Sequence, residues 1–154
     1  MKISEIQSKL LQQEYILLSL GSSVGEGEKI LKDAEIFLQK NGIRIIKKST
    51  NHKTKPWGGV AQNDFTNATW FIQMFSTKFA QRPYKKALQL LKIIHECEAL
   101  AGRDRSKQKR WGDRPLDIDI LWFPGLSCDT KRLKLPHPYM FERDFVLDPL
   151  KEIL

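Results

Sequence analysis

The most informative part of this sequence is the stretch Arg110-Trp-Gly-Asp-Arg-Pro-Leu-Asp-Ile-Asp-Ile120. From Leu116 onward, acidic and apolar residues alternate, which predicts a β-strand with Asp117 and Asp119 on one face and aliphatic side chains on the other. Two neighbouring carboxylates repel each other, and burying either one uncompensated costs free energy. We therefore expect a cation between them, and a hard divalent ion such as Mg²⁺ suits aspartate oxygens.

The segment just before this strand is strongly basic. Against only two aspartates it carries Arg103, Arg105, Lys107, Lys109, Arg110 and Arg114. Arginine offers planar, bidentate donors to phosphate, and Mg²⁺ in proteins often shares its coordination between carboxylates and phosphate oxygens. The acid pair and the basic loop together predict a polyphosphate ligand. Each signal is weak by itself, and a solvated strand face beside a solvated loop is the alternative.

The composition of the chain limits the classes of protein to which it can belong. The 154 residues fit one domain, and 41% hydrophobic with 29% charged residues is ordinary for a globular protein. No apolar run approaches the roughly 18 residues of a membrane span, and the N-terminus lacks the pattern of a signal peptide. Cys97 and Cys128 are expected to be free thiols in a reducing cytoplasm. The net charge of +8 predicts an anionic partner without choosing among nucleic acid, membrane and nucleotide.

The hydrophobic pattern predicts a mixed fold. The expected elements are a strand at 15–20, a helix from about residue 30 to Asn41-Gly42, strands at 43–54 and 65–75, a helix from Pro83 to Gly102, and a strand at 116–123. The order strand, helix, strand, strand, helix, strand predicts an α+β, ferredoxin-like sandwich with helices on one face of an antiparallel sheet.

Residues 1–14 are expected to be an N-terminal extension to a domain of residues 15–154. An apolar stripe at helical spacing predicts a helix that packs on the domain, with a partner-binding segment as the alternative. The stripe consists of Ile3, Ile6, Leu10 and Leu11.

Two single residues are candidates for nucleotide contacts. Glu98 falls at helical spacing from the apolar stripe of its helix, so we expect it to reach solvent at the helix edge. The alternative is a carboxylate on the inner side that accepts hydrogen bonds from a ribose or base. His137, fixed between two prolines, is either incidental or a donor to phosphate or a proton carrier. His52 and His95 lack metal-ligand spacing, and no role is assigned to them.

Three residues near the Gly58-Gly59 loop predict a slot for a flat heterocycle. Trp57 and Phe65 offer aromatic faces for stacking, and Asn67 offers an amide to read a polar edge. Taken singly, each is more typical of an ordinary core or turn residue.

Four segments, in order, resemble the 6-hydroxymethyl-7,8-dihydropterin pyrophosphokinase family of folate biosynthesis. The resemblance covers about Tyr15 to Leu150 and departs from the family pattern at Lys55, at Trp57 and by one extra residue between Arg105 and Arg110. The four segments are Leu18-Ser-Leu-Gly-Ser22, Phe65-Thr-Asn-Ala68, Arg110–Ile120, and Leu135-Pro-His-Pro138 with Glu142-Arg-Asp-Phe-Val-Leu147.

The resemblance implies a ferredoxin-like fold and pyrophosphoryl transfer from ATP to the pterin hydroxymethyl oxygen, with release of AMP. It implies catalytic roles for Arg105, Arg110, Asp117 and Asp119, with both aspartates as ligands of two Mg²⁺ ions. It implies ATP contacts for Glu98, Arg103, Arg110, Trp111, Arg114, Ile120, Arg132, His137 and Arg143. It also implies that Arg103, Arg105 and Arg110 contact the phosphates from a loop that closes over the site. It implies pterin contacts for Thr54, Lys55, Trp57, Phe65, Asn67, Asp117 and Phe145.

We therefore expect a cytoplasmic, monomeric transferase that acts on small molecules and binds neither nucleic acid nor membrane. The alternative from another class is a basic RNA-binding module on the same fold. Such modules carry an RNP1 pattern, which this sequence lacks, and an acid pair on the sheet would repel a phosphate backbone.

Overall fold

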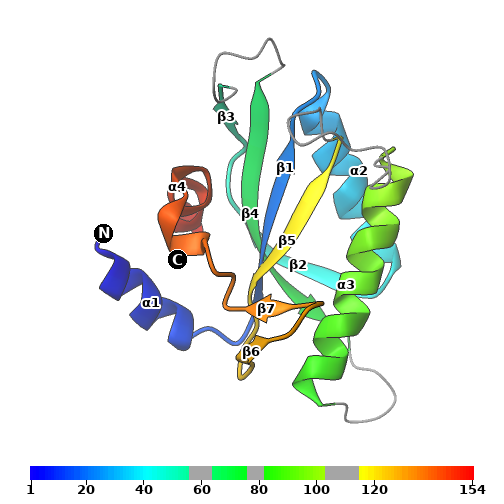
Figure 1. Cartoon of the computed structure of the whole chain (residues 1–154). Helices are drawn as coiled ribbons and strands as arrows, with labels where there is room; N and C mark the ends of the chain where they lie inside the picture. Colours follow the sequence, from blue (N-terminus) through cyan, green and yellow to red (C-terminus); the bar gives the residue numbers. More distant parts are fainter. Residues whose placement is uncertain (56–63, 76–81, 103–114) are drawn as a thin grey trace.

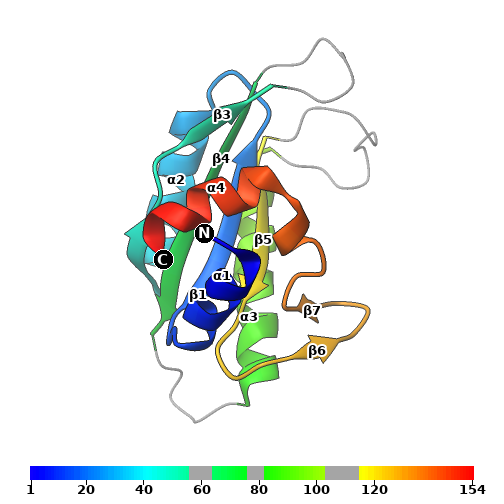
Figure 2. The same ribbon diagram turned by 90° about the vertical axis from the view of Figure 1, so that its left-hand side faces the viewer.

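The computed structural model describes residues 1–55, 64–75, 82–102 and 115–154. An antiparallel sheet forms the middle layer, between two layers of helices (Figures 1 and 2). The helices are α1 (Ile3–Leu11), α2 (Gly27–Lys40), α3 (Pro83–Leu100) and α4 (Asp144–Ile153), with a 3₁₀ turn, η2 (Met140–Glu142). The sheet strands are β1 (Ile16–Ser22), β2 (Ile43–Lys48), β3 (His52–Thr54), β4 (Phe65–Met74) and β5 (Asp117–Trp122); a separate hairpin joins β6 (Cys128–Asp129) and β7 (Lys134–Leu135).

The long strand β4 organises the sheet, whose order is β2-β4-β1-β5 with β3 also paired to β4. All of these pairings are antiparallel. Strand β1 lies in the middle, where Gly21 is opposite both Asn67 and Asp117. This register matters because residues directly opposite each other in an antiparallel sheet point to the same face.

One face of the sheet is covered by α2 and α3, as the sequence predicted. Alternate residues of β1, such as Leu18 and Leu20, are buried there against the apolar stripes of the two helices. Helix α3 begins with Pro83 in its first turn, where a missing N–H costs nothing. It ends before Gly102, whose φ of +96° is the left-handed conformation that glycine adopts without strain. The predicted α+β, ferredoxin-like class is confirmed.

The opposite face is covered in part by α1 and α4, whereas the sequence predicted helices on one face only. Ile6 and Leu10 of α1 are 0% exposed and pack in a cluster with Leu17 of β1 and Phe71 of β4. Helix α4 adds Val146, Leu147, Leu150 and Ile153 to this cluster. The predicted N-terminal helix is confirmed, while α4 and the β6–β7 hairpin correspond to no predicted element.

The predicted continuous strand at 43–54 is wrong, because the chain leaves the sheet ladder between β2 and β3. At Ser49 the side chain takes part in the pairing to β4. Ser49 N–H donates to the Thr69 carbonyl at 3.0 Å, but Thr69 N–H donates to Ser49 Oγ, also at 3.0 Å, and not to a backbone carbonyl. Thr50 then bonds to a residue of α4 instead of to β4. Tertiary contacts, not local sequence, divide the strand here.

Candidate active site

The sheet face that α1 and α4 cover is polar beyond the edge of their apolar cluster. Two rows of paired residues make up this polar half-face. Asp117, Gly21 and Asn67 form one row across β5, β1 and β4, and Asp119, Ser19 and Thr69 form the next. Directly paired residues share a face, so the register alone gathers acidic, hydroxyl and amide groups from three strands.

The acid pair lies on β5 as the sequence predicted. Asp117 and Asp119 are both half-buried, and they alternate with Ile118 and Ile120, each 4% exposed. The isoleucines point to the other face, into the core beneath α3. Ile120, expected near adenosine, therefore lies behind the sheet from the acid pair.

Asn67 is buried, and its side chain bonds to β3 and lies over Gly21 of β1. Its Nδ2 donates to Thr54 Oγ1 at 3.0 Å, and its Oδ1 lies only 3.1 Å from where a Cβ on Gly21 would be. Gly21 therefore leaves the space that the amide oxygen occupies. Phe65, half-buried, pairs with Thr54 at the start of β4. The structure thus brings three predicted pterin residues together, Thr54, Phe65 and Asn67, while Lys55 is exposed beside them.

His137 follows the cis Leu135-Pro136 bond, and its N–H donates to the Leu121 carbonyl of β5 at 2.9 Å. Tyr139 N–H donates to His137 Nδ1 at 3.2 Å, so a neutral ring carries its proton on Nε2. Burial lowers the pKa of His137 first, and the nearby Arg143 charge lowers it further, while Asp117 opposes them. The imidazole is therefore a neutral donor at pH 7 that lies within the electrostatic reach of Asp117.

Arg143 lies at the start of α4 between two aromatic rings. Its guanidinium carbon is 5.2 Å from the Tyr139 ring centre and 5.6 Å from the Phe145 ring centre, within the range of cation–π attraction. Phe145 and Tyr139 are both exposed. This stacking orients a cation and an aromatic face beside the polar half-face.

Glu98 is not at a solvent-exposed helix edge, so that expectation is wrong. It is 1% exposed, and Ile118 N–H of β5 donates to its Oε2 at 3.0 Å. The alternative of an inward-facing carboxylate describes its position correctly, although the acceptor is bonded to the protein backbone.

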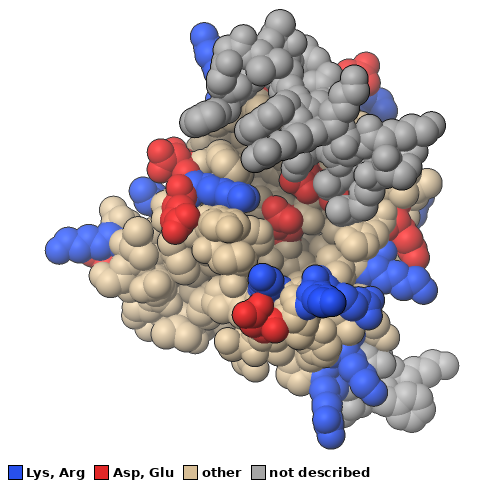
Figure 3. All heavy atoms as spheres, in the orientation of Figure 1, with Lys and Arg blue, Asp and Glu red and all other residues tan. Residues whose placement is uncertain are grey.

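Arg132 lies on the turn between β6 and β7. It borders an open groove along the outer side of α3, together with Lys131, Lys85 and Lys92. Figure 3 shows basic side chains gathered over this end of the molecule. The predicted loop residues Trp57, Arg103, Arg105, Arg110, Trp111 and Arg114 lie outside the described residues.

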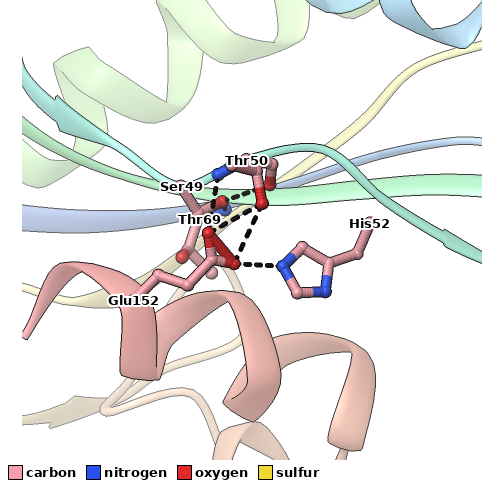
Figure 4. A network of polar contacts seen from close by, with 5 residues as sticks. All are labelled: Ser49, Thr50, His52, Thr69 and Glu152. Atoms are coloured by element: carbon pink, nitrogen blue, oxygen red, sulfur yellow. Dashed lines mark hydrogen bonds and ion pairs between the residues drawn. The ribbon is translucent and has the colours of Figure 1, made fainter.

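A polar network that the sequence did not predict joins α4 to the break between β2 and β3 (Figure 4). Thr50 donates to Glu152 Oε1 through its N–H at 3.0 Å and its hydroxyl at 2.7 Å, and His52 Nε2 bonds to Oε2. These hydrogen bonds, led by that from the Thr50 hydroxyl, lower the pKa of Glu152 to about 2. Partners about a hundred residues apart leave no local signal. We call these residues, with Ser49 and Thr69, the Glu152 network.

The donor set fits Mg²⁺. Within the described ranges, no three His, Cys, Asp or Glu side chains gather closely enough to hold a metal by themselves. Asp117 and Asp119 thus offer two hard carboxylates on a half-exposed face, and water or phosphate oxygens would complete an octahedral shell. Two carboxylates suited to a hard cation, with a neutral imidazole donor and an oriented guanidinium among the neighbouring residues, are typical of transferases that act on polyphosphates.

A comparison with known protein families supports this class of enzyme. The model of the 7,8-dihydro-6-hydroxymethylpterin-pyrophosphokinase (HPPK) family matches residues 17–154, and the chain belongs to this family. Membership assigns it pyrophosphokinase activity in folate biosynthesis and confirms the resemblance.

Relatives in three bacteria carry the name 2-amino-4-hydroxy-6-hydroxymethyldihydropteridine pyrophosphokinase. The protein of Methylorubrum extorquens is 38% identical over 88% of this chain and 80% of its own length. That of Bacillus subtilis is 36% identical over 88% of this chain and 75% of its own length. That of Porphyromonas gingivalis is 34% identical over 90% of this chain and 89% of its own length. Among the described residues, no helix is both long and apolar enough to cross a membrane.

Proposed function

We propose that this chain transfers pyrophosphate from ATP to 6-hydroxymethyl-7,8-dihydropterin and releases AMP and the pterin diphosphate. The row Asp117, Gly21 and Asn67 carries the proposal. In this row the Asp117 carboxylate, which is suited to bind a metal ion, lies two strand spacings, about 10 Å, from the oriented Asn67 amide. A two-ring heterocycle with a hydroxymethyl arm can bridge that span, with its polar edge at the amide and its hydroxyl at the carboxylate.

Asn67 is well suited to read the pterin edge. Because Nδ2 donates to Thr54, the opposite oxygen, Oδ1, is directed over Gly21, where it can accept from ring or amino N–H groups. Phe65 and Phe145 would stack on the two ring faces. Lys55 and Trp57 are proposed to line the same slot, and their difference from the family pattern is expected to alter its shape.

The phosphates would bind next to Asp117 and Asp119. These two carboxylates would hold two Mg²⁺ ions, which when bound neutralise charge on the transferring group. His137 can donate its Nε2–H to a phosphate oxygen without adding charge, and Arg143 can donate as an oriented cation. We propose further ATP contacts for Glu98, Arg103, Arg105, Arg110, Trp111, Arg114, Ile120 and Arg132.

In the reaction, the hydroxymethyl oxygen forms a bond to the β-phosphorus of ATP. The bond from that phosphorus to the oxygen bridging to the α-phosphate breaks, AMP leaves with that oxygen, and the hydroxyl proton is released. We propose that Asp117 contacts the attacking hydroxyl and that Arg105 and Arg110 bind the transferring group. Catalysis then depends on positioning and electrostatics more than on a strong base. The substrates are small molecules, and we propose that the enzyme is a cytoplasmic monomer.

The direct test is incubation of the purified protein with MgATP and 6-hydroxymethyl-7,8-dihydropterin, followed by chromatography of nucleotides and pterins. Equal amounts of AMP and pterin diphosphate are expected, and neither should form when the pterin is omitted. Formation of ADP in place of AMP, or AMP without pterin diphosphate, would overturn the proposal. Omission of Mg²⁺ with a chelator should stop the reaction.

A further inference from the structure

Glu152 joins the two elements that form opposite sides of the proposed pterin slot. Its carboxylate accepts from Thr50 and His52, at the start of the segment that continues through β3 to Thr54. Thr54 is the residue that orients the Asn67 amide. On the other side, Glu152 belongs to α4, whose first turn carries Phe145.

Helix α4 crosses the sheet face from the β5 side toward the break between β2 and β3 (Figure 2). Phe145 and Glu152 are seven residues apart in this helix, which corresponds to about 10 Å along its axis. A shift of Glu152 relative to β3 therefore moves the Phe145 side of the slot relative to the Thr54 side. Figure 4 shows the Glu152 side chain directed at Thr50 and His52.

Helix α4 is also held on the sheet by apolar contacts. Val146, Leu147, Leu150 and Ile153 anchor the helix in the apolar cluster on the same face. The hydrophobic effect that drives this burial is non-directional, so hydrogen bonds at one end of the helix add a restraint of a different kind on its position along the strands. Directional hydrogen bonds at one end of the helix can fix that position.

We propose that Glu152 is a positioning residue for the pterin: it sets the spacing between β3, with Thr54 and Asn67, and the first turn of α4, with Phe145. This inference rests on the proposed function, because the slot that it adjusts is the proposed pterin site. In this role Glu152 acts through these neighbours and not by contact with the substrate. Asp117 and Asp119, the proposed metal ligands, lie on β5, whereas the hydrogen bonds that Glu152 makes to described residues run to Thr50 and His52, before and in β3.

The test compares Glu152→Ala, Glu152→Gln and Thr50→Val with Asp148→Ala. Asp148 is an exposed carboxylate on the same helix and serves as the matched control for lost charge. For Glu152→Ala, the KM of the pterin should rise about five- to tenfold, while the KM of MgATP should change by less than about twofold. Glu152→Gln should recover most of the loss, because one side-chain oxygen accepts both Thr50 donors. Thr50→Val should give a smaller increase of about threefold.

Several results would overturn the inference. Equal increases in both KM values would indicate general loosening, and a fall in kcat alone would indicate a different role. If Glu152→Ala does not fold, as judged by circular dichroism, a folded Thr50→Val variant with unchanged pterin KM would still contradict it.

Equilibrium binding of the pterin to each variant, with a non-hydrolysable ATP analogue, separates this inference from the proposed function. Weaker pterin binding by Glu152→Ala supports the positioning role even if wild-type protein makes no AMP, a result that would contradict only the proposed function. Absence of pterin binding by the wild-type protein would overturn both. Equal affinities for wild type and Glu152→Ala would overturn the positioning role alone.

Discussion

The same strands form two very different halves of one sheet face. In the covered half, Leu17, Phe71 and Leu121 point into an apolar cluster sealed by α1 and α4. In the polar half-face, one or two alternating positions further along, the same strands present Ser19, Asn67, Asp117 and other polar residues. The difference is one of position along the strand, not of secondary structure.

This contrast separates stability from chemistry within one sheet. Removing an apolar side chain from the covered half costs burial free energy. Removing a polar group from the other half is expected to cost the interactions that we propose it makes with substrate. The two halves meet at Thr69, which is 0% exposed and whose Oγ1 has no hydrogen-bond partner among the described residues. Substitutions on either side of that boundary should therefore affect different measurements.

The largest effect is expected at the acid pair. Asp117→Ala or Asp119→Ala should lower pterin-dependent AMP formation at least about a thousandfold, because each removes a carboxylate expected to hold the charge-neutralising metal. Thermal unfolding should change little, since both residues are half-buried. Asp129→Ala, at an exposed position of β6, is the control and should retain activity. Normal turnover in both acid-pair variants would contradict the metal role.

A substitution in the covered half should show the reverse pattern. Phe71→Ala should lower the free energy of unfolding by about 3–5 kcal/mol, through lost burial and the cavity that remains. Denaturant unfolding measures this loss. At temperatures where the variant stays folded, its kcat should lie within about twofold of wild type. A severe loss of kcat in the folded variant would show that the two halves are not separable.

Gly21→Ala tests whether the position of the Asn67 amide in the polar half-face matters for pterin binding. The added Cβ would lie 3.1 Å from Asn67 Oδ1, a contact tight enough to displace the amide. The KM of the pterin should rise about three- to tenfold. The KM of MgATP, measured in the same preparations, should stay unchanged. An unchanged pterin KM would mean that Asn67 does not read the pterin edge.

The smallest effect concerns pH and the Glu152 network. The pKa of Glu152 lies at about 2, below its ordinary 4.5, because the folded state stabilises the ionised form. Its contribution to stability is therefore complete above pH 4.5 and disappears as pH falls toward 2. The side chain is 32% exposed, so solvent screens the effect. Relative to Glu152→Gln, the wild-type advantage in denaturant unfolding should shrink over that range; a constant difference would contradict this.

Elements with strong local patterns were predicted from the sequence. The alternation around Asp117 and Asp119 gave β5 and the shared face of the acid pair, and Pro83 with Gly102 gave both ends of α3. Local pattern failed where distant contacts decide. The break after Lys48 depends on Thr69 and Glu152, and helix α4 contains Pro149, a residue that argues against a helix interior.

In the candidate site, too, local features could be predicted from the sequence and features that depend on distant contacts could not. Residue types and spacing predicted the acid pair and an aromatic slot, because those features lie within short segments. The roles proposed for individual residues stay predictions. The sequence could not show that Gly21 makes room for Asn67 or that Glu152 meets His52, since both depend on strand register and helix position.

The hydrogen bond from Ile118 N–H to Glu98 lies on a strand at the edge of the sheet. Strand β5 is the last strand of the sheet on its side, and a terminal strand with unpaired N–H groups can recruit a strand from another molecule. Here a buried carboxylate already occupies one of those donors. An incoming strand would have to displace this carboxylate, so the bond removes one donor from the edge that a partner strand could use.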